Sequence, residues 1–199
     1  MVAVGVCRAA HLSGMKQVMD AAASFIKPDR SSFDLIRGQH APDFRSARVA
    51  ALYRYWRSRR LGALPMRADI EPADIKSLLP FVIIVDLQAD PFRVFYRLVG
   101  TAVVHASGMD FTGTYLDELA FDICATPDLI RAYRAVSESR WPGLGMAFAQ
   151  ITHQTALDVE YLICPLGDAE GAVRQCLVIE DYVAKEGFES GKLRLARPV

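Results

Sequence analysis

The spacing of hydrophobic residues changes along this chain, first to a helical period and then to that of strands. In residues 44–61, the apolar side chains of Val49, Leu52, Tyr53 and Trp56 recur every three to four positions, which predicts an amphipathic helix. Arginines fill much of the remaining circumference. We therefore expect a helix that packs through one apolar stripe and exposes a basic face.

The ends of this predicted helix carry capping signals. Asp43 follows Pro42 at the position of an N-cap, and Gly62 follows the last apolar residue. The basic face is interpreted first as a solvated surface and, as an alternative, as a docking surface for an acidic partner. DNA recognition by this helix is disfavoured because no second helix follows at helix-turn-helix spacing.

Strand patterns begin at residue 81. Residues 81–87 form a continuous apolar run, and residues 92–99 alternate between two faces after a short turn. So short a link joins antiparallel strands. Within the second strand, Arg97 has three interpretations: a half-exposed side chain packed on the sheet, an ion pair with Asp86 that fixes the hairpin register, or an anion-binding group in a pocket.

Helical signals separate this hairpin from a second group of strands. Residues 102–107 favour a short helix, and residues 115–119 a turn. Residues 126–139 favour a longer helix that begins with a capping Thr126 and has Pro127 at its first position.

Alternating strands with hairpin-sized links then occupy residues 144–151, 157–164 and 174–183. The order of elements predicts an α+β fold. It has a five-stranded antiparallel sheet with helices on one face, preceded by the N-terminal amphipathic helix.

The segments outside these patterns are expected to be peripheral. A short helix is predicted over residues 15–26, and a polar connector without a clear period over residues 29–42. The predicted division is a partly mobile N-terminal extension over residues 1–42, a domain over residues 43–184 whose first helix is 43–62, and a C-terminal tail over residues 185–199.

Several local motifs carry a resemblance to a known family. They are the stretches LPMRADIEP at residues 64–72, LP at 79–80, FYRLVGT at 95–101 and DFTG at 110–113, together with Trp56 in the preceding helix. With the strand and helix order over residues 81–183, the chain resembles a bacterial family of small stand-alone PAS proteins, which are α+β domains. The resemblance implies a sensory or protein-interaction module that usually performs no catalysis.

The resemblance also implies a pocket between the sheet and its helices. Pattern alone leaves open which strand face points inward, because a shift of one residue exchanges the two faces. The ligand-binding candidates are Tyr96, Leu98, His105, Tyr115, Met146, Phe148 and Tyr161. Each of them also has a plain interpretation as a core or surface residue.

Cofactor chemistry has little support in the sequence. His105 is the one histidine in a predicted pocket helix, and the longer helix offers no second candidate for axial haem ligation. Cys124 lies in the sequence Asp-Ile-Cys-Ala, which does not match the motif of a flavin-adduct cysteine. Haem and flavin are therefore not supported, and the cofactor is unknown.

Composition and motifs limit the other functional classes that the chain could belong to. Acidic and basic residues balance at 23 each, which argues against general nucleic-acid binding. Neither hydrolase nor nucleotide-binding motifs occur, so we expect no enzyme. The four cysteines form no CxxC pair, and we interpret them as reduced thiols rather than as metal ligands. With no apolar run long enough to span a membrane, a cytoplasmic location is expected.

Three functions follow from these observations. The leading hypothesis is a cytoplasmic sensory module that acts through small-ligand binding and protein–protein contacts, as a homodimer and with a separate signalling protein. In it, the N-terminal helix packs on the sheet or pairs with its copy through Leu52, Tyr53 and Trp56. The alternatives are an adaptor with a filled core and no ligand, and a small ligand carrier or enzyme of a related α+β fold.

Overall fold

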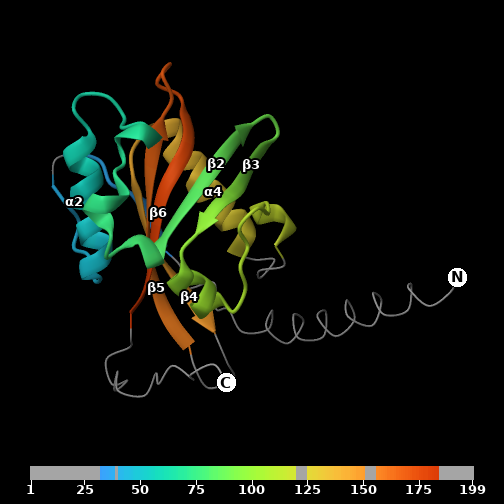
Figure 1. Ribbon diagram of the computed structural model, residues 1–199. Helices are drawn as coiled ribbons and strands as arrows, with labels where there is room; N and C mark the ends of the chain where they lie inside the picture. Colours follow the sequence, from blue (N-terminus) through green and yellow to red (C-terminus); the bar gives the residue numbers. More distant parts are fainter. Residues whose placement is uncertain (1–31, 39, 120–124, 151–155, 184–199) are drawn as a thin grey trace, which may run out of the picture.

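A single antiparallel sheet organises the chain in the computed structural model, which describes residues 32–38, 40–119, 125–150 and 156–183 (Figure 1). The sheet has six strands in the order β1-β4-β5-β6-β2-β3. Their bounds are β1 Ser32–Leu35, β2 Val82–Ala89, β3 Phe92–Val99, β4 Gly143–Gln150, β5 Ala156–Gly167 and β6 Val173–Val183. The helix predicted over residues 15–26 lies outside the described residues.

Helices cover both faces of this sheet. Helix α2 (Ala47–Arg59) contacts β5 and β6 on one face, and α4 (Ala125–Ser139) contacts β3, β5 and β6 on the other (Figure 1). We call these the α2 face and the α4 face. The shorter elements are α3 Thr101–Ser107 and the 3-10 helices Arg67–Asp69, Pro72–Ile75, Leu79–Phe81 and Leu116–Glu118.

The sixth strand corrects the sequence prediction, which had five strands and a polar connector over residues 29–42. In β1, Phe33 and Leu35 alternate with Ser32 and Asp34, and the strand pairs antiparallel with β4. Four residues are too few for an alternating pattern to stand out from a connector. The pairing extends the sheet beyond β4 and brings the Phe33 ring over the α4 face.

The start of α2 also differs from the prediction. The N-cap is Ser46, whose hydroxyl accepts hydrogen bonds from the backbone N–H groups of Arg48 and Val49, each at 3.1 Å. Asp43 lies three residues earlier, outside the helix. Both residues are favourable N-cap types, so sequence alone could not choose between them. The apolar stripe of α2 is buried as the helical spacing predicted.

The β2–β3 hairpin confirms the ion pair proposed between Arg97 and Asp86. Arg97 Nε donates to the Asp86 carboxylate at 2.6 Å, and Gln175 of β6 donates to the other oxygen at 2.6 Å. Burial alone would raise the pKa of Asp86, but these bonds and the arginine charge hold it below its usual value. The same hairpin contains a register shift between Ile84 and Val85.

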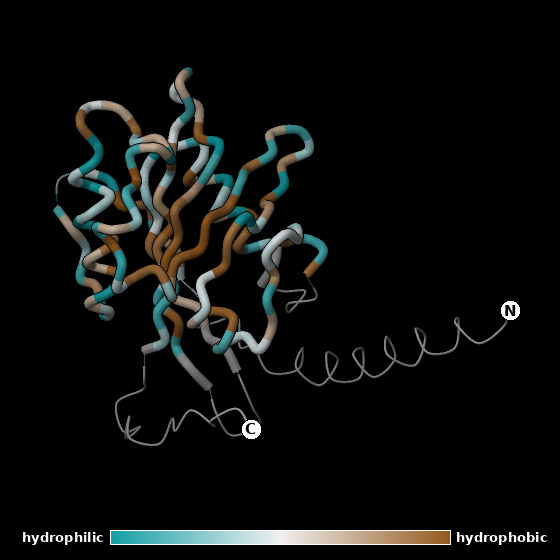
Figure 2. The backbone as a smooth tube through the Cα atoms, viewed as in Figure 1, coloured by the Kyte–Doolittle hydropathy of each residue, from teal (hydrophilic) through white to brown (hydrophobic). Residues whose placement is uncertain are grey.

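Hydrophobic residues concentrate in the central strands, as the brown segments of the backbone show in Figure 2, while the hairpin tips are hydrophilic. Leu162, Ile163, Cys164, Leu177 and Ile179 are almost completely buried. Successive residues of β5 and β6 point to opposite faces, and both series are buried. The middle of these two strands therefore lies between two hydrophobic layers, one under α2 and one under α4.

Candidate functional site

Polar and aromatic side chains meet on the α4 face. Tyr161 of β5 lies directly opposite Glu180 of β6 in the antiparallel ladder, and Val159 lies opposite Tyr182 two residue pairs further along. Residues at positions i and i+2 share a face, so Glu180 and Tyr182 lie on the same side of the sheet. This side is the α4 face, because Tyr133 of α4 interacts electrostatically with both Tyr161 and Glu180.

Strand β3 contributes a further aromatic residue to this group. Tyr96 is 3% exposed, packs edge-on against Phe111 with ring centroids 4.6 Å apart, and interacts electrostatically with Tyr133. Tyr133 itself is 2% exposed. We call Tyr96, Tyr133, Tyr161, Glu180 and Tyr182 the tyrosine–glutamate cluster.

Desolvation dominates the electrostatics of the cluster. It raises the pKa of Glu180 to about 7, although a side-chain hydrogen bond with Tyr182 acts in the opposite direction. It also raises the pKa of Tyr161 to about 12, with a contribution from the Glu180 charge. The pKa values of Tyr96 and Tyr133 are raised by burial first and by neighbouring groups second. The tyrosines therefore remain neutral near pH 7, and Glu180 is the group that titrates there.

Two glycines of β4 make room for aromatic rings beside this cluster. A Cβ atom added at Gly145 would overlap the ring of Tyr161, and one added at Gly143 would overlap the ring of Phe33. The two rings stack with centroids 6.4 Å apart and an interplanar angle of 13°. The small residues of β4 thus let Phe33 and Tyr161 lie flat across the α4 face.

The predicted ligand-binding residues are divided by the fold. Tyr96 and Tyr161 lie together in the tyrosine–glutamate cluster. Leu98 does not: it pairs with Ile84, is 43% exposed and lies on the α2 face. The period-two pattern placed Tyr96 and Leu98 on one face, but the register shift beside Ile84 breaks the alternation.

The other predicted residues lie away from the cluster. His105 is exposed on α3. Tyr115 lies beyond the edge of β3, where its ring packs against Phe95 at 5.1 Å and its hydroxyl accepts a hydrogen bond from Gln88 at 2.6 Å. Met146 pairs with Glu160 on the α2 face. Phe148 belongs to β4, but its side chain lies outside the described residues.

Sequence reasoning missed Glu180 and Tyr133. The signal for Glu180 was present: it continues the series of Cys176 and Val178, which are buried, and a carboxylate in such a series is unusual. Tyr133 lies within the helix predicted over residues 126–139, where the pattern gives it no role beyond packing. Its proximity to Glu180 depends on how α4 crosses the sheet, which no local pattern specifies.

A second polar group, on the α2 face, anchors α2. Glu160 is 1% exposed, and its two carboxylate oxygens accept the backbone N–H groups of Arg45 at 2.9 Å and Ser46 at 2.6 Å. Directly opposite in the ladder, Asp181 accepts a hydrogen bond from Ser46 Oγ at 2.6 Å and from Arg48 at 3.0 Å. We call these five residues the α2 anchor.

The residues predicted to form a dimer interface are buried within this chain. Leu52, Tyr53 and Trp56 are at most 3% exposed, and Trp56 Nε1 donates a hydrogen bond to the Pro165 carbonyl of β5 at 2.9 Å. The helix was predicted either to pack on the sheet or to pair with a second copy, and in the structure it packs on the sheet. Its apolar stripe is buried there, so these three side chains offer no surface to a second copy. Dimerisation itself stays a prediction.

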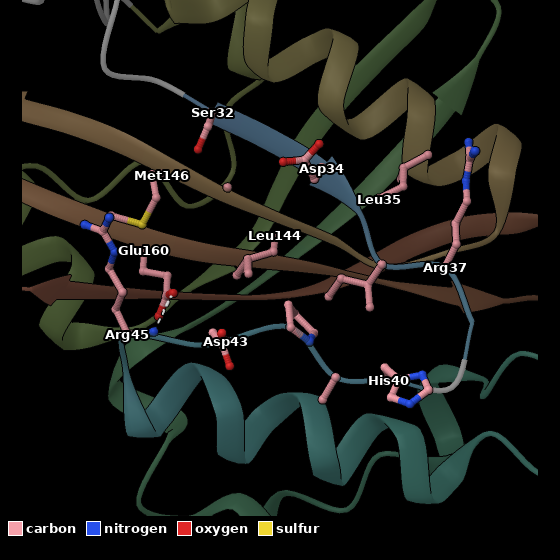
Figure 3. A pocket seen from close by; sticks show the side chains of 14 residues that line it. Ser32, Asp34, Leu35, Arg37, His40, Asp43, Arg45, Leu144, Met146 and Glu160 are labelled. Atoms are coloured by element: carbon pink, nitrogen blue, oxygen red, sulfur yellow. Dashed lines mark hydrogen bonds between the residues drawn. The ribbon is translucent and has the colours of Figure 1, made fainter.

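A groove of about 420 Å³ lies beside the α2 anchor, between β4 and the segment that precedes α2 (Figure 3). Leu144 and Met146 line it from β4, and Asp43 and Arg45 from the opposite side. Glu160, the buried polar side chain of its lining, already uses both oxygens on backbone N–H groups. The groove therefore offers a ligand exposed charges of both signs. The buried carboxylate of Glu160 is already satisfied by two backbone N–H groups and is not available to a ligand.

Within the described ranges, no three histidine, cysteine or acidic side chains come close enough together to hold a metal ion. No helix in this part of the chain is both long and apolar enough to cross a bilayer. Cys164 and Cys176 are buried free thiols, and burial raises the pKa of each.

The antiparallel sheet, with α2 across one face and α4 across the other, defines an α+β domain. The sequence profile of the family described as PAS domain matches residues 44–179, and the chain belongs to this family. PAS domains are a sensory and signalling module type and are typically not catalytic. No curated protein matches the chain.

Solved structures show distant similarity. A light-oxygen-voltage domain studied with a flavin analogue is 14% identical, with a TM-score of 0.42, and the match covers 57% of this chain and 84% of that one. An RNA-binding light-oxygen-voltage receptor is 9% identical, with a TM-score of 0.44 and coverage of 82% and 47%. The light state of the Aureochrome1 light-oxygen-voltage domain is 12% identical, with a TM-score of 0.39 and coverage of 59% and 91%. Such distant matches say nothing about a ligand of this chain.

Proposed function

We propose that this PAS domain is a sensor that binds a small molecule between the α4 face and α4, and that it signals through protein contacts. The observation that carries the proposal is the tyrosine–glutamate cluster. A pocket with aromatic walls and a few convergent polar groups is typical of small-molecule sites. A titratable group with a strongly shifted pKa inside such a pocket adds support.

The burial of Glu180 supports an internal site. Desolvation raises the pKa of its carboxyl to about 7, whereas a carboxyl that faces bulk water would keep an ordinary pKa.

The route of the signal is proposed from the ladder. Tyr161 and Glu180 face α4, while the adjacent residues Glu160 and Asp181 face α2 and belong to its anchor. A ligand that shifts β5 against β6 at the first pair therefore moves the second pair as well. The exposed basic side of α2 would present this change to an acidic surface of a separate signalling protein.

Native mass spectrometry with an absorbance scan of the purified chain tests the ligand proposal. We expect an additional non-covalent mass that disappears on denaturation. Tyr133→Trp should remove it by filling the site with a larger ring, whereas Tyr55→Trp, a matched change on α2, should not. The proposal is wrong if the wild-type chain carries no added mass and a panel of small aromatic and aliphatic amines, amides and acids leaves its melting temperature unchanged.

One observation favours the adaptor with a filled core as the second candidate. Phe33 and Tyr161 already occupy the space above Gly143 and Gly145, and Val136 of α4 packs beside them, 3.2 Å from a Cβ placed at Gly143. If the space near Glu180 is filled in the same way, the chain should give one bare mass. Tyr133→Trp should then destabilise the fold strongly through overpacking instead of displacing a ligand.

A further inference from the structure

Two of the described arginines are partly buried, and they differ in their partners. Arg93 of β3 forms ion pairs with Asp117 at 2.9 Å and with Glu118 at 2.7 Å. Arg60, which directly follows α2, makes no ion pair and no side-chain hydrogen bond with any described residue. Because a charge is costly to remove from water, a partly desolvated guanidinium is normally paired with a carboxylate. Within the described part of the chain, the charge of Arg60 is therefore uncompensated.

Aromatic rings hold the guanidinium of Arg60 at the wall of a cleft. Its Cζ atom lies 4.5 Å from the ring centroid of Trp141 and 5.4 Å from that of Trp56. A cleft of about 300 Å³ lies beside these side chains, and Tyr53 and Gly62 also line it. A guanidinium that stacks on a ring can still donate from its edge to a planar acceptor. No described side-chain nitrogen is both fully buried and without a partner, so the donors of Arg60 remain accessible from the cleft.

A second arginine adds to the positive charge of this cleft. Burial lowers the pKa of Arg60, and the nearby charge of Arg140 lowers it further. Arg140 is exposed and forms no ion pair with a described residue. Its φ angle is 60°, a left-handed conformation directly after α4, where glycine is the usual residue. The chain thus places a long cationic side chain where the backbone favours none, and the two guanidiniums together would suit a carboxylate.

The rim of the cleft favours a protein as the source of that carboxylate. Leu61 lies between Arg60 and Gly62, which both line the cleft, and it is 90% exposed, the highest value for a large hydrophobic side chain in the described ranges. Arg57 extends the basic lining by one helical turn. Tryptophan and arginine are enriched among the residues that dominate protein interfaces. A free inorganic anion would use the guanidiniums but not the leucine.

Deepening the protein contact of the proposed function, we infer that an acidic segment of the signalling partner docks at this cleft, with a carboxylate across Arg60 and Arg140 and a neighbouring apolar side chain on Leu61. We call these three residues and the cleft beside them the docking cleft. The inference rests on the proposed function for the existence of a partner. Because α2 is a continuous helix from the α2 anchor to the docking cleft, a displacement of its first turn would move Arg60 as well.

Proton–nitrogen correlation NMR of the full chain tests this inference. The chain has two tryptophans, so Trp141→Phe identifies which of the two indole N–H signals belongs to Trp141. The probe is the acetylated and amidated peptide Glu-Glu-Leu-Glu-Glu, and its control has glutamine at every glutamate. We expect the acidic peptide to shift the Trp141 signal in a saturable way, and the glutamine peptide to bind about tenfold more weakly or not at all.

Two substitutions and a matched control locate the binding. Arg60→Gln should weaken binding of the acidic peptide about tenfold, whereas Arg54→Gln, the same loss of charge at an exposed position of α2 outside the cleft, should change it little. Arg140→Gly removes the second guanidinium and relieves the left-handed backbone, so it should weaken binding while the melting temperature stays the same or rises. This variant still decides the question if Arg60→Gln does not fold.

The inference is wrong if the acidic peptide leaves the Trp141 signal unchanged, or if the glutamine peptide binds equally well. It is also wrong if inorganic phosphate binds as tightly as the peptide, which would indicate a site for a small anion, or if phosphatidylglycerol vesicles bind in place of the peptide. A ligand mass on the purified chain with a negative peptide titration would refute the docking cleft alone. Peptide binding without any ligand mass would refute the small-molecule proposal and keep the docking cleft.

Discussion

The α2 anchor allows a sharp test of what holds α2 on the sheet. Glu160→Gln keeps the size and shape of the side chain but replaces one carboxylate oxygen with an N–H₂ group. In the wild-type chain both oxygens accept backbone N–H groups, from Arg45 and Ser46. After the change, one oxygen still accepts, but the amide nitrogen cannot, so one buried N–H group at the start of α2 loses its acceptor.

The magnitude follows from two opposing effects. A buried donor without an acceptor costs about 1–3 kcal/mol of unfolding free energy. The substitution also removes the like-charge contact between Glu160 and Asp181, which lie directly opposite in the ladder; its relief returns about 0.2–1 kcal/mol. We therefore expect a net loss of about 1–2 kcal/mol, which lowers the melting temperature of a chain this size by about 2–8 °C.

Urea denaturation followed by circular dichroism measures the global effect, and tryptophan fluorescence reports on α2. Trp56 lies on the buried side of α2 and donates a hydrogen bond to the Pro165 carbonyl, so its emission should shift to the red earlier in urea if α2 detaches first. Trp141→Phe as a background removes the other tryptophan. Glu170→Gln serves as the exposed control. Equal urea midpoints for Glu160→Gln and this control would refute the reasoning that the carboxylate anchors α2.

Three further changes probe the packing and charge of the sheet. Gly145→Ala should lower the unfolding free energy by about 1–3 kcal/mol because its Cβ overlaps the ring of Tyr161, and an unchanged urea midpoint would contradict this. Trp56→Phe should cost about 1–3 kcal/mol because the buried Pro165 carbonyl loses its donor; a stability loss no larger than that of an exposed control would argue against this. The pKa of the Glu180 carboxyl is higher in the folded chain than in the unfolded chain. The unfolding free energy of the wild-type chain should therefore fall by about 1–3 kcal/mol as pH rises from about 4.5 to about 7. Denaturation across this range should show a flatter profile for Glu180→Gln, and identical profiles would count against a raised carboxyl pKa.

Local pattern predicted those parts of the fold whose signal lies within one element. Strands β2 and β3 and helix α4 appear close to their predicted bounds, because each combines a clear period with a turn or cap at its end. Strand β1 has no such local signal. Phe33 and Leu35 can be recognised as strand residues only once β1 is known to pair with β4 at Gly143 and Gly145, which are distant in sequence.

The candidate site depended on long-range geometry in the same way. Tyr96 lies on the α4 face, but Leu98, which the alternation grouped with it, does not, because the register shift beside Ile84 leaves no mark in the sequence pattern. Glu180 was passed over because an acidic residue next to Asp181, near the end of an apolar strand, looks like an interruption of the pattern. It becomes informative once Tyr161 is known to lie opposite it and Tyr133 above it.

The tyrosine–glutamate cluster and the α2 anchor are connected because consecutive residues of a strand point to opposite faces of the sheet. Glu160 and Tyr161 are consecutive, as are Glu180 and Asp181, so each strand carries one member of the cluster on the α4 face and one of the anchor on the α2 face. No relay of side chains through the sheet is needed to link them, because the backbone that positions one residue positions its neighbour. A change in spacing between β5 and β6 large enough to admit a ligand beside Glu180 would therefore lengthen the short bonds that Glu160 and Asp181 make to Ser46. Since those bonds lie at the first turn of α2, that end of the helix is where a change on the α4 face should first appear.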